Sequence, residues 1–344
     1  MINSRVNIPG FAPGAVQSIK DSRDWLFSAV AGAKSIADIP VEGGLDDIPL
    51  IIRDQKDVPT CTGEAGRYMQ MISQYLETGK ITDLSAMFIY NLNRTHDGLP
   101  PDTDGSTMRA TADTLRLWGV CKEILFPSVK NNYRITPGGS GVMTDAYNHR
   151  IIAYTKCVTL EDILLSLADK KPAMFSMFLL SDFFKAQKGW VPKQVGGGFV
   201  GGHAMVAVTY NLDQEWVKIV QSYGSDTTLT DKGYMYIPFS WFRYRFYDFG
   251  DFPMLMDAYN VLDYVPPQQV TVPDKITIGK RLPRVEINGQ LVTGRIPAII
   301  AEEWEATLVH IRVLEQISAI MEQITGYKVQ VIWDADDYAV KINI

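Results

Sequence analysis

The order of the hydrophobic patterns along the chain constrains the fold more than any other feature. Three segments in the first half carry apolar residues at helical spacing, at about residues 61–78, 108–118 and 160–168. The period then changes to that of short strands bounded by Gly, Asn and Asp, at residues 205–210, 215–220 and 233–238. Helices followed by strands predict an α+β fold rather than alternating βαβ units.

The length of the chain predicts more than one domain. Its 344 residues exceed what one hydrophobic core usually serves. Residues 1–45 are rich in Gly and Pro, which indicates an extended N-terminal arm. We expect the α+β body over residues 46–265. Pro266 and Pro267 mark the linker to a C-terminal domain at 266–344.

Residues 266–344 predict a small α+β domain of their own. The Asn288-Gly289 turn indicates a hairpin, a long helix is expected over 297–325, and alternating segments at 327–333 and 338–344 indicate a second hairpin. The apolar stripes of the helix are wide enough to be covered on two sides. Two interpretations remain open: the helix packs on its own hairpins and on the body, or residues 1–45 and 266–344 dock onto another copy of the chain or into a larger protein assembly.

Composition excludes several classes of protein. The formal net charge of −6 argues against a protein that binds nucleic acid through phosphate neutralisation. No apolar run approaches the roughly 18–20 residues of a membrane span, and the first residues do not read as a secretory signal. An odd set of three cysteines (Cys61, Cys121 and Cys157) fits a reducing compartment rather than a disulfide framework. We expect a cytoplasmic protein, or a virion-associated one if it is phage-encoded.

No cofactor or metal site is expected. The four histidines (His96, His149, His203 and His310) show no spacing typical of zinc ligands, and the chain contains no Cys-x-x-Cys pair. The glycine-rich stretch 196–202 lacks the Lys-Ser/Thr ending of a phosphate loop and precedes a strand rather than a helix. We interpret it as a turn that lets other backbone approach closely.

Cys61 and His203 are the candidate reactive pair. Cys61 stands at the start of the first predicted helix, where the helix dipole and unpaired backbone N–H groups favour a thiolate. His203 precedes an apolar strand, which could hold its ring at the edge of a cleft. A histidine close to such a cysteine can accept its proton. Taken alone, both residues also fit ordinary buried positions.

The segments around these two residues resemble those of the papain-like (C1) cysteine peptidases. Gln55 stands six positions before Cys61, as a Gln does in that family. Gly201-Gly202-His203-Ala204 resembles the start of its histidine strand, and Gln221-Ser222-Tyr223-Gly224 resembles its Asn-Ser-Trp-Gly motif. Further matches with the bacterial branch extend the resemblance over about residues 46–245.

The resemblance implies a fold, an activity and a set of site residues. The fold would be two-lobed, with a helical half and an antiparallel β-barrel-like half that meet at the active-site cleft. Cys61 would be the nucleophile that attacks a peptide bond of a peptide or protein substrate, and His203 would carry the proton. Gln55 and the Cys61 N–H would hold the oxyanion, and Gln221 would orient His203.

Several positions depart from the family pattern. Gln221 and Tyr223 replace Asn and Trp, and Thr62 replaces the Trp that follows the nucleophile. Nothing before residue 46 resembles the long helical inhibitory prosegment of the eukaryotic members. Because Gln is one methylene longer than Asn, it would hold the imidazole less firmly, so slower or narrower activity is expected.

Two alternatives to a peptidase remain open. One is a catalytically weak or inactive papain-like module that is a structural or binding component of an assembly such as a phage particle. The degraded motif at Gln221 and the extra C-terminal domain favour it. The other is a cell-wall amidase on a related scaffold, which the spacing of Gln55 disfavours.

Overall fold

The computed structural model describes most of the first 262 residues and parts of four strands beyond them. The described residues are 5–21, 24–30, 34–225, 228–246, 251–262, 284–287, 290–291, 330–334 and 339–343. The chain divides into two compact units, Met1–Gln268 and Gln269–Ile344.

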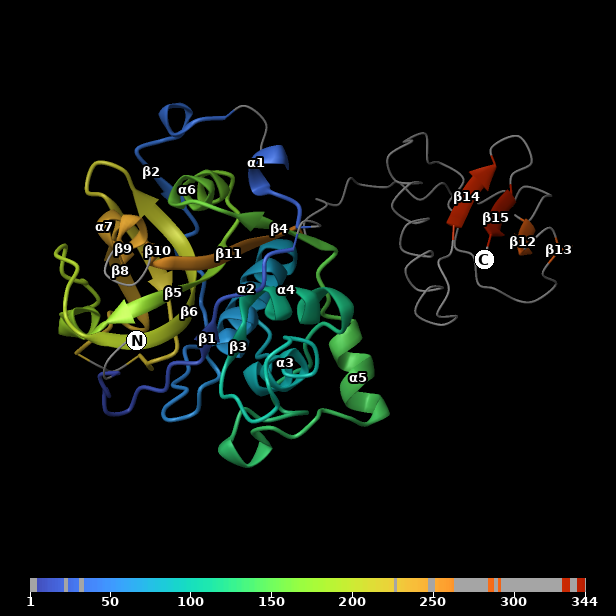
Figure 1. The fold of residues 1–344 in the computed structure, drawn as a ribbon, viewed down its shortest axis with the longest axis horizontal. Helices are drawn as coiled ribbons and strands as arrows, with labels where there is room; N and C mark the ends of the chain where they lie inside the picture. Colours follow the sequence, from blue (N-terminus) through green and yellow to red (C-terminus); the bar gives the residue numbers. More distant parts are fainter. Residues whose placement is uncertain are drawn as a thin grey trace. The chain divides into compact units, whose positions relative to one another are not determined.

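The first unit has two lobes, one mainly helical and one built on a sheet. The α-helices of this unit are α1 (Phe27–Val30), α2 (Cys61–Thr78), α3 (Ala86–Asn93), α4 (Met108–Leu117), α5 (Ser140–Tyr147), α6 (Leu160–Ala168) and α7 (Phe239–Arg243). Short 3₁₀ turns are η1 (Ile36–Asp38), η2 (Lys130–Asn132) and η3 (Ser181–Lys185). Helices α2 to α5 gather on one side of the sheet, and α6 and α7 lie on the other (Figure 1).

A seven-stranded antiparallel sheet forms the second lobe. Its strands are β2 (Glu42–Gly44), β4 (Ala153–Cys157), β5 (Ala173–Leu180), β6 (Phe199–Asn211), β7 (Trp216–Val220), β8 (Tyr234–Pro238) and β11 (Leu255–Leu262). The order is β4-β11-β5-β6-β7-β8, and β2 adds to β6. Two small pairs complete the unit: β1 (Ala15–Val16) with β3 (Ser106–Thr107), and β9 (Arg245–Phe246) with β10 (Phe252–Pro253).

The three predicted helices and three predicted strands are confirmed as α2, α4, α6, β6, β7 and β8. Helix α2 ends where the sequence indicates, because Gly79 adopts a left-handed conformation at φ 67° and its N–H bonds to the carbonyl of Tyr75. Helix α6 starts with a capping box, in which Thr159 and Asp162 satisfy each other's backbone N–H groups. The predicted α+β class is therefore confirmed.

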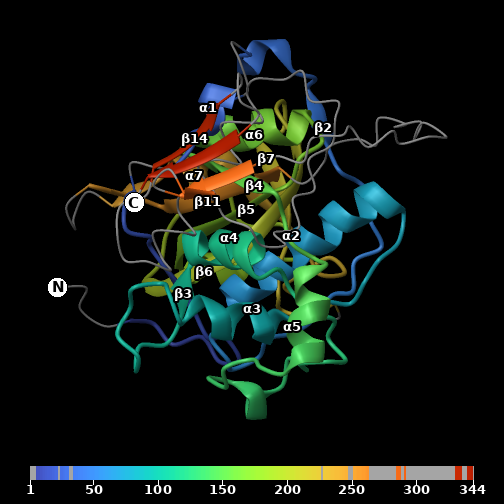
Figure 2. The ribbon, with the colours of Figure 1, turned by 90° about the vertical axis from the view of Figure 1, so that its right-hand side faces the viewer.

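Two hydrophobic cores lie on the two faces of the sheet. On β6, Met205 and Ala207 pack with the residues of α6 and α7, whereas Ala204 and Val206 pack with those of α2, α3 and α4. This alternation is the period of a strand buried on both faces. Figure 2 shows the helical lobe below the sheet in the rotated view. Within the part of the chain that the structure describes, no helix is long and apolar enough to cross a membrane.

The second unit contains a four-stranded sheet. Its strands are β12 (Arg284–Ile287), β13 (Gln290–Leu291), β14 (Gln330–Asp334) and β15 (Ala339–Asn343), in the order β13-β12-β15-β14. The antiparallel pairs β12–β13 and β14–β15 are the two predicted hairpins, and β12 runs parallel to β15. The predicted helix over 297–325 lies outside the described residues.

Candidate active site

Cys61 is the first residue of α2 and is fully buried. Thr60 precedes it as the N-cap but makes no side-chain capping bond. The thiol therefore lies at the positive end of an 18-residue helix. Backbone N–H groups of Ala204, on β6, and of Gly14 act to lower the pKa of this thiol.

His203 lies on β6, one residue before Ala204. Its ring is fully buried and stacks on the ring of Tyr223, with centroids 4.8 Å apart and planes inclined by 11°. Tyr223, which stands where the resembled motif has Trp, thus covers one face of the His203 ring. Neither ring nitrogen of His203 has a hydrogen-bond partner among the described residues.

Gln55 is fixed by hydrogen bonds on both sides of its amide. The oxygen accepts from the Ser222 hydroxyl at 2.5 Å, and the Gln55 backbone N–H donates to the Ser222 carbonyl at 2.9 Å. These bonds orient the amide nitrogen, which donates to the carbonyls of Val58 at 2.9 Å and Ala12 at 3.0 Å. A side-chain N–H that is held in one orientation and binds a peptide carbonyl can serve as an oxyanion donor.

Gln221 directly follows β7 and is 1% exposed. Neither its amide oxygen nor its amide nitrogen has a hydrogen-bond partner among the described residues. The bond to His203 that the sequence predicts is therefore not formed in this structure. The role of Gln221 stays a prediction.

The N-terminal arm occupies the junction of the two lobes above these residues. It begins along β6, where the Arg5 Nε and the Val6 N–H each donate to a β6 carbonyl at 2.7 Å. Phe11 packs edge-on against His203, with ring centroids 5.3 Å apart. The Gly14 carbonyl then accepts from the Ser106 N–H at 2.8 Å, and β1 continues parallel to β3.

Glycines on β6 make room for the arm. A Cβ on Gly202 would lie 2.1 Å from the carbonyl oxygen of Ala15, and one on Gly201 would lie 2.7 Å from the Pro13 ring. Gly201 also has φ 147°, which side chains rarely adopt. The predicted close backbone approach at the glycine-rich stretch is confirmed, and the approaching backbone is the arm of the same chain. A cavity of about 340 Å³ remains between the arm and the surrounding lobes.

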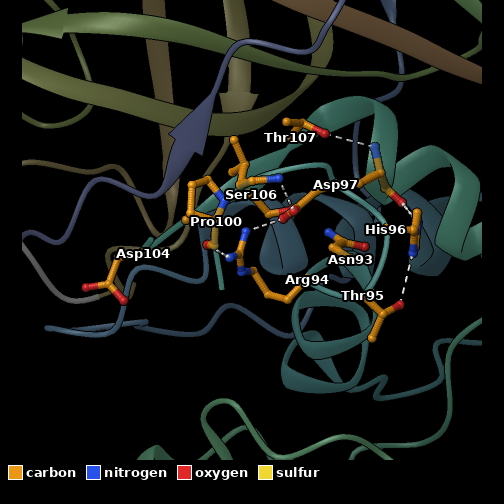
Figure 3. Close-up of polar contacts among 12 residues, drawn as sticks. Asn93, Arg94, Thr95, His96, Asp97, Pro100, Asp104, Ser106 and Thr107 are labelled. Atoms are coloured by element: carbon orange, nitrogen blue, oxygen red, sulfur yellow. Dashed lines mark hydrogen bonds and ion pairs between the residues drawn. The ribbon is translucent and has the colours of Figure 1, made fainter. Parts of the chain in front are cut away.

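The strand that pairs with the arm is held by a buried carboxylate. Asp97 accepts from the Ser106 hydroxyl at 2.9 Å and pairs with Arg94 at 2.5 Å, and Figure 3 shows both side chains reaching it. The side chain of Asp97 is 1% exposed, so these bonds lie out of solvent. His96 of the same loop bonds to the Ala110 carbonyl at 3.2 Å. The loop thus presents β3 as a fixed edge to the arm.

A charge network anchors the arm beyond the site. Arg109 pairs with Asp21 at 2.6 Å and with Asp24 at 2.9 Å. Lys156 also reaches Asp24, at 3.6 Å, and the Asp24 side chain is 3% exposed. The Ser18 N–H donates to the buried carboxylate of Asp257 at 2.7 Å. These bonds fix the chain directly after the segment that covers Cys61.

Burial keeps the reactive pair uncharged in this arrangement. It raises the pKa of the Cys61 thiol to about 11, although the backbone N–H groups of Ala204 and Gly14 oppose the shift. Burial lowers the pKa of His203 to about 3. Near pH 7 the thiol and the imidazole are therefore both neutral, and the structure represents a covered form of the site.

The remaining candidates lie apart from this site. Cys121 and Cys157 are buried free thiols, in line with a packing role. His149 is half-buried, with its Nδ1 2.7 Å from Gln74 Nε2. His310 lies outside the described residues. Over the described ranges, no group of three or more His, Cys, Asp or Glu side chains is placed to hold a metal ion.

Sequence reasoning gave no role to three residues that the structure places in the site. Phe11 stands between Gly10 and Pro13 in the arm, a pattern that indicates only an extended segment. Phe184 belongs to η3 and packs on Phe11 with centroids 4.8 Å apart. Ser222 was part of the matched motif, but only the fold shows that it orients Gln55.

The fold has the architecture of the papain-like cysteine proteases, with Cys61 on α2 and His203 on β6. Among solved structures, the chain is similar to xylellain, a cysteine protease from Xylella fastidiosa. The TM-score is 0.61 at 20% identity, over 76% of this chain and all of that one. Procathepsin B S9 from Trypanosoma congolense matches with a TM-score of 0.53 at 15% identity, over 73% and 87% of the two chains.

In sequence, the chain is similar to an uncharacterized peptidase C1-like protein, L477, of Acanthamoeba polyphaga mimivirus. The two are 24% identical over 256 residues, which cover 66% of this chain and 81% of the relative. No model of a known protein family matches the chain. The predicted resemblance to the papain-like C1 group is confirmed by these likenesses.

Proposed function

We propose that this protein is a cysteine peptidase in which Cys61 attacks the substrate carbonyl and His203 transfers the proton. Gln55 and the Cys61 N–H stabilise the oxyanion, and Gln221 orients the His203 ring once the site opens. One observation carries the proposal. The side-chain amide of Gln55 already binds a peptide carbonyl, that of Ala12, at 3.0 Å.

In the covered form the protein is inactive, because the arm occupies the site. Attack requires a thiolate, and the buried thiol of Cys61 has a pKa of about 11. A substrate carbonyl also has to take the place of Ala12 at Gln55. Catalysis therefore begins with displacement of the segment 5–16, which admits both water and substrate. Rehydration lowers the pKa of the thiol and raises that of His203, which favours the ion pair.

An alkylating probe specific for activated thiols tests the proposal. We expect the full chain to be labelled at Cys61 near pH 7, faster in Phe11→Ala, and not in His203→Ala. Cys157→Ala is the matched control, because it removes a buried cysteine outside the site and should keep the labelling. Labelling that persists in His203→Ala would contradict the assigned pair.

The alternative is a papain-like module with little or no catalytic power that acts in a protein assembly. The unpartnered amide of Gln221 and the unpartnered nitrogens of His203 favour it, because neither group is held for proton transfer within the described residues. Absence of Cys61 labelling in both the wild type and Phe11→Ala would support this alternative. Parallel assays with a peptide library and a peptidoglycan digest separate a peptidase from an amidase.

A further inference from the structure

A cavity of about 490 Å³ lies outside the candidate active site, between the arm and the sheet lobe. One wall is the arm, at Gln17, Ser18 and Lys20. The other walls are residues 156–161, where β4 ends and α6 begins, residues 242–245, where α7 ends, and residues of β10 and β11. We call this cavity the arm pocket. Its volume is that of a small-molecule site, which usually lies at about 300–1,000 Å³.

The inner surface of the arm pocket is apolar. Leu160, Phe242, Leu255 and Met256 line it, and each of them is less than a tenth exposed. Apolar surface of a ligand that packs against these side chains leaves water, which is favourable in proportion to the area buried. The inner surface therefore fits an apolar body.

Positive charge exceeds negative charge around the same cavity. Four basic and two acidic side chains line it, namely Lys20, Lys156, Arg243 and Arg245 against Glu161 and Asp257. The outermost cations are accessible: Lys20 is exposed on the arm, and the side chains of Arg243 and Arg245 are 54% and 42% exposed. An anionic group at the mouth of the pocket would meet these cations.

Lys156 is the basic side chain that lies deepest in the arm pocket. Its side chain is only 17% exposed, and its ammonium lies 3.5 Å from the carboxylate of Asp257 and 3.6 Å from that of Asp24. Charge-assisted hydrogen bonds between an ammonium and a carboxylate are shorter, at about 2.7–2.9 Å. Because an ammonium has three donors, Lys156 keeps the capacity to bind a further anion.

We propose that the arm pocket binds a small anionic amphiphile, with one carboxylate or phosphate head and an apolar body, and that this ligand holds the arm in the covered form. The head pairs with Lys20 of the arm and with Lys156 and Arg243 of the body, and the apolar part packs on the inner surface. The inference does not rest on the proposed peptidase function, since it concerns only binding and the position of the arm.

The position of the arm pocket couples its ligand to the active site. Gln17 directly follows β1, whose pairing with β3 belongs to the segment that has to leave when the site opens. Release of residues 5–16 therefore loosens the wall at Gln17, Ser18 and Lys20. A ligand that contacts this wall and the body together binds the covered form more tightly, so by linkage it stabilises that form.

Four probes test the chemistry of the ligand by titration calorimetry on the full chain. Octanoate and octyl phosphate carry both a head and an apolar body, whereas 1-octanol and inorganic phosphate each lack one of them. We expect at least one amphiphile to bind about tenfold or more tightly than either incomplete probe, and the tighter amphiphile identifies the head group. Equal binding of 1-octanol would overturn the role of the cations, and equal binding of inorganic phosphate that of the apolar surface. Absence of binding by both amphiphiles would overturn the proposal.

Substitution of two exposed cations places the ligand in the arm pocket. The double variant Lys20→Gln, Arg243→Gln should weaken binding of the tighter amphiphile by about fivefold or more. Lys80→Gln, Arg116→Gln is the matched control, because it removes an exposed lysine after α2 and an arginine on α4, neither of which lines the pocket. An equal loss in both double variants, or no loss in either, would place the amphiphile elsewhere and contradict the assignment.

Hydrogen exchange tests whether the ligand holds the arm. At a saturating concentration, the tighter amphiphile should slow exchange of the peptide containing residues 5–16 by about fivefold or more. At the same concentration the slowing should be smaller in Lys20→Gln, Arg243→Gln and unchanged in Lys80→Gln, Arg116→Gln. The readout needs no catalysis, so it stands even if Cys61 proves unreactive. Unchanged or faster exchange at saturation would show that the occupied pocket does not hold the arm.

Discussion

The nucleophile side and the histidine side of the site differ in how their polar groups are bonded. On the nucleophile side, Gln55 is bonded to Ser222, Val58 and Ala12. On the histidine side, the ring nitrogens of His203 and the amide of Gln221 have no partner among the described residues. The arm accounts for part of this difference, because it offers a carbonyl to Gln55 but an apolar ring to His203.

In the proposed mechanism, this difference means that the oxyanion donor Gln55 is preorganised whereas the proton carrier His203 is not. Donors that are already aimed cost no reorganisation during the reaction. A neutral and unbonded histidine has to gain both water and a partner before it can act. The arm therefore restrains the proposed proton transfer through His203, which needs a charged imidazole. It leaves the Gln55 amide already in position.

The largest effect on kcat is expected when the preorganised amide of Gln55 is removed. In the Phe11→Ala background, Gln55→Ala should lower kcat by about 10²- to 10³-fold, the usual cost of losing one oxyanion donor. Steady-state kinetics on a peptide substrate measures it. Gln214→Ala is the matched control, because the Gln214 amide bonds to the Trp216 indole rather than within the site. A change below about threefold would show that Gln55 only supports the arm.

Lower pH should open the arm, because it favours protonation of His203. The pKa of His203 is about 3 in the covered form and 6.5 in an exposed ring, so the open form binds more protons between these pH values. Stability of the covered form is therefore present above pH 6.5 and is lost as the pH falls. Each unit below 6.5 should favour the open form by up to about tenfold.

Hydrogen exchange of the peptide containing residues 5–16 measures this opening, after correction for the intrinsic pH dependence of exchange. His203→Phe is the control, since a ring that cannot be protonated should remove most of the dependence. This control is needed because protonation of Asp257 could also loosen the arm. Burial raises the pKa of its carboxyl, which accepts a hydrogen bond from the Ser18 N–H and so anchors the arm. If the pH dependence of opening is unchanged in His203→Phe, the acid response comes from Asp257 rather than from His203.

A smaller effect is expected when the arm loses its ring. Phe11→Ala removes an apolar contact worth about 1.5–3 kcal/mol, so the population of the open form should rise about ten- to hundredfold. The rate at which an alkylating probe labels Cys61 at pH 7 reports this population. Phe252→Ala should leave the rate unchanged, because it removes an exposed ring elsewhere. Equal rates in the wild type and Phe11→Ala would mean that the arm opens without resistance from Phe11.

The smallest expected effect separates stability from activity at Gln221. Because the amide is buried without a partner, Gln221→Met should change the free energy of unfolding by less than about 1 kcal/mol, or increase it. If the amide orients His203 in the open form, the same variant should lose about tenfold in kcat. Chemical denaturation and steady-state kinetics check the two parts, and full activity in Gln221→Met would remove Gln221 from the mechanism.

Sequence patterns predicted the parts of the fold that are encoded locally. The spacing of apolar residues and the stop at Gly79 predicted α2, and a helix start placed Cys61 correctly. Strand β5 was missed because Ala173–Leu180 is an almost continuous apolar run, without the alternation that marks a strand with one solvated face. The two hairpins of the C-terminal unit were predicted from alternation and a turn motif.

The occupied site could not be predicted in the same way. Phe11 and His203 are 192 positions apart in the chain, and no local pattern links an extended Gly- and Pro-rich segment to one particular surface. The only sequence signal was the glycine-rich stretch, which indicated a close approach without naming the approaching segment. The orphaned nitrogens of His203 depend on three-dimensional packing alone.

The arm is covalently joined to the site it covers, and this determines how opening responds to concentration. Anchored by Asp21 and Asp24, the segment 5–16 stays at an effective concentration on the order of millimolar around Cys61. Dilution of the protein therefore cannot empty the site, and opening is a first-order event with the same rate at any protein concentration. A free peptide with the sequence of the arm lacks this advantage, and a substrate has to outcompete a ligand that never diffuses away.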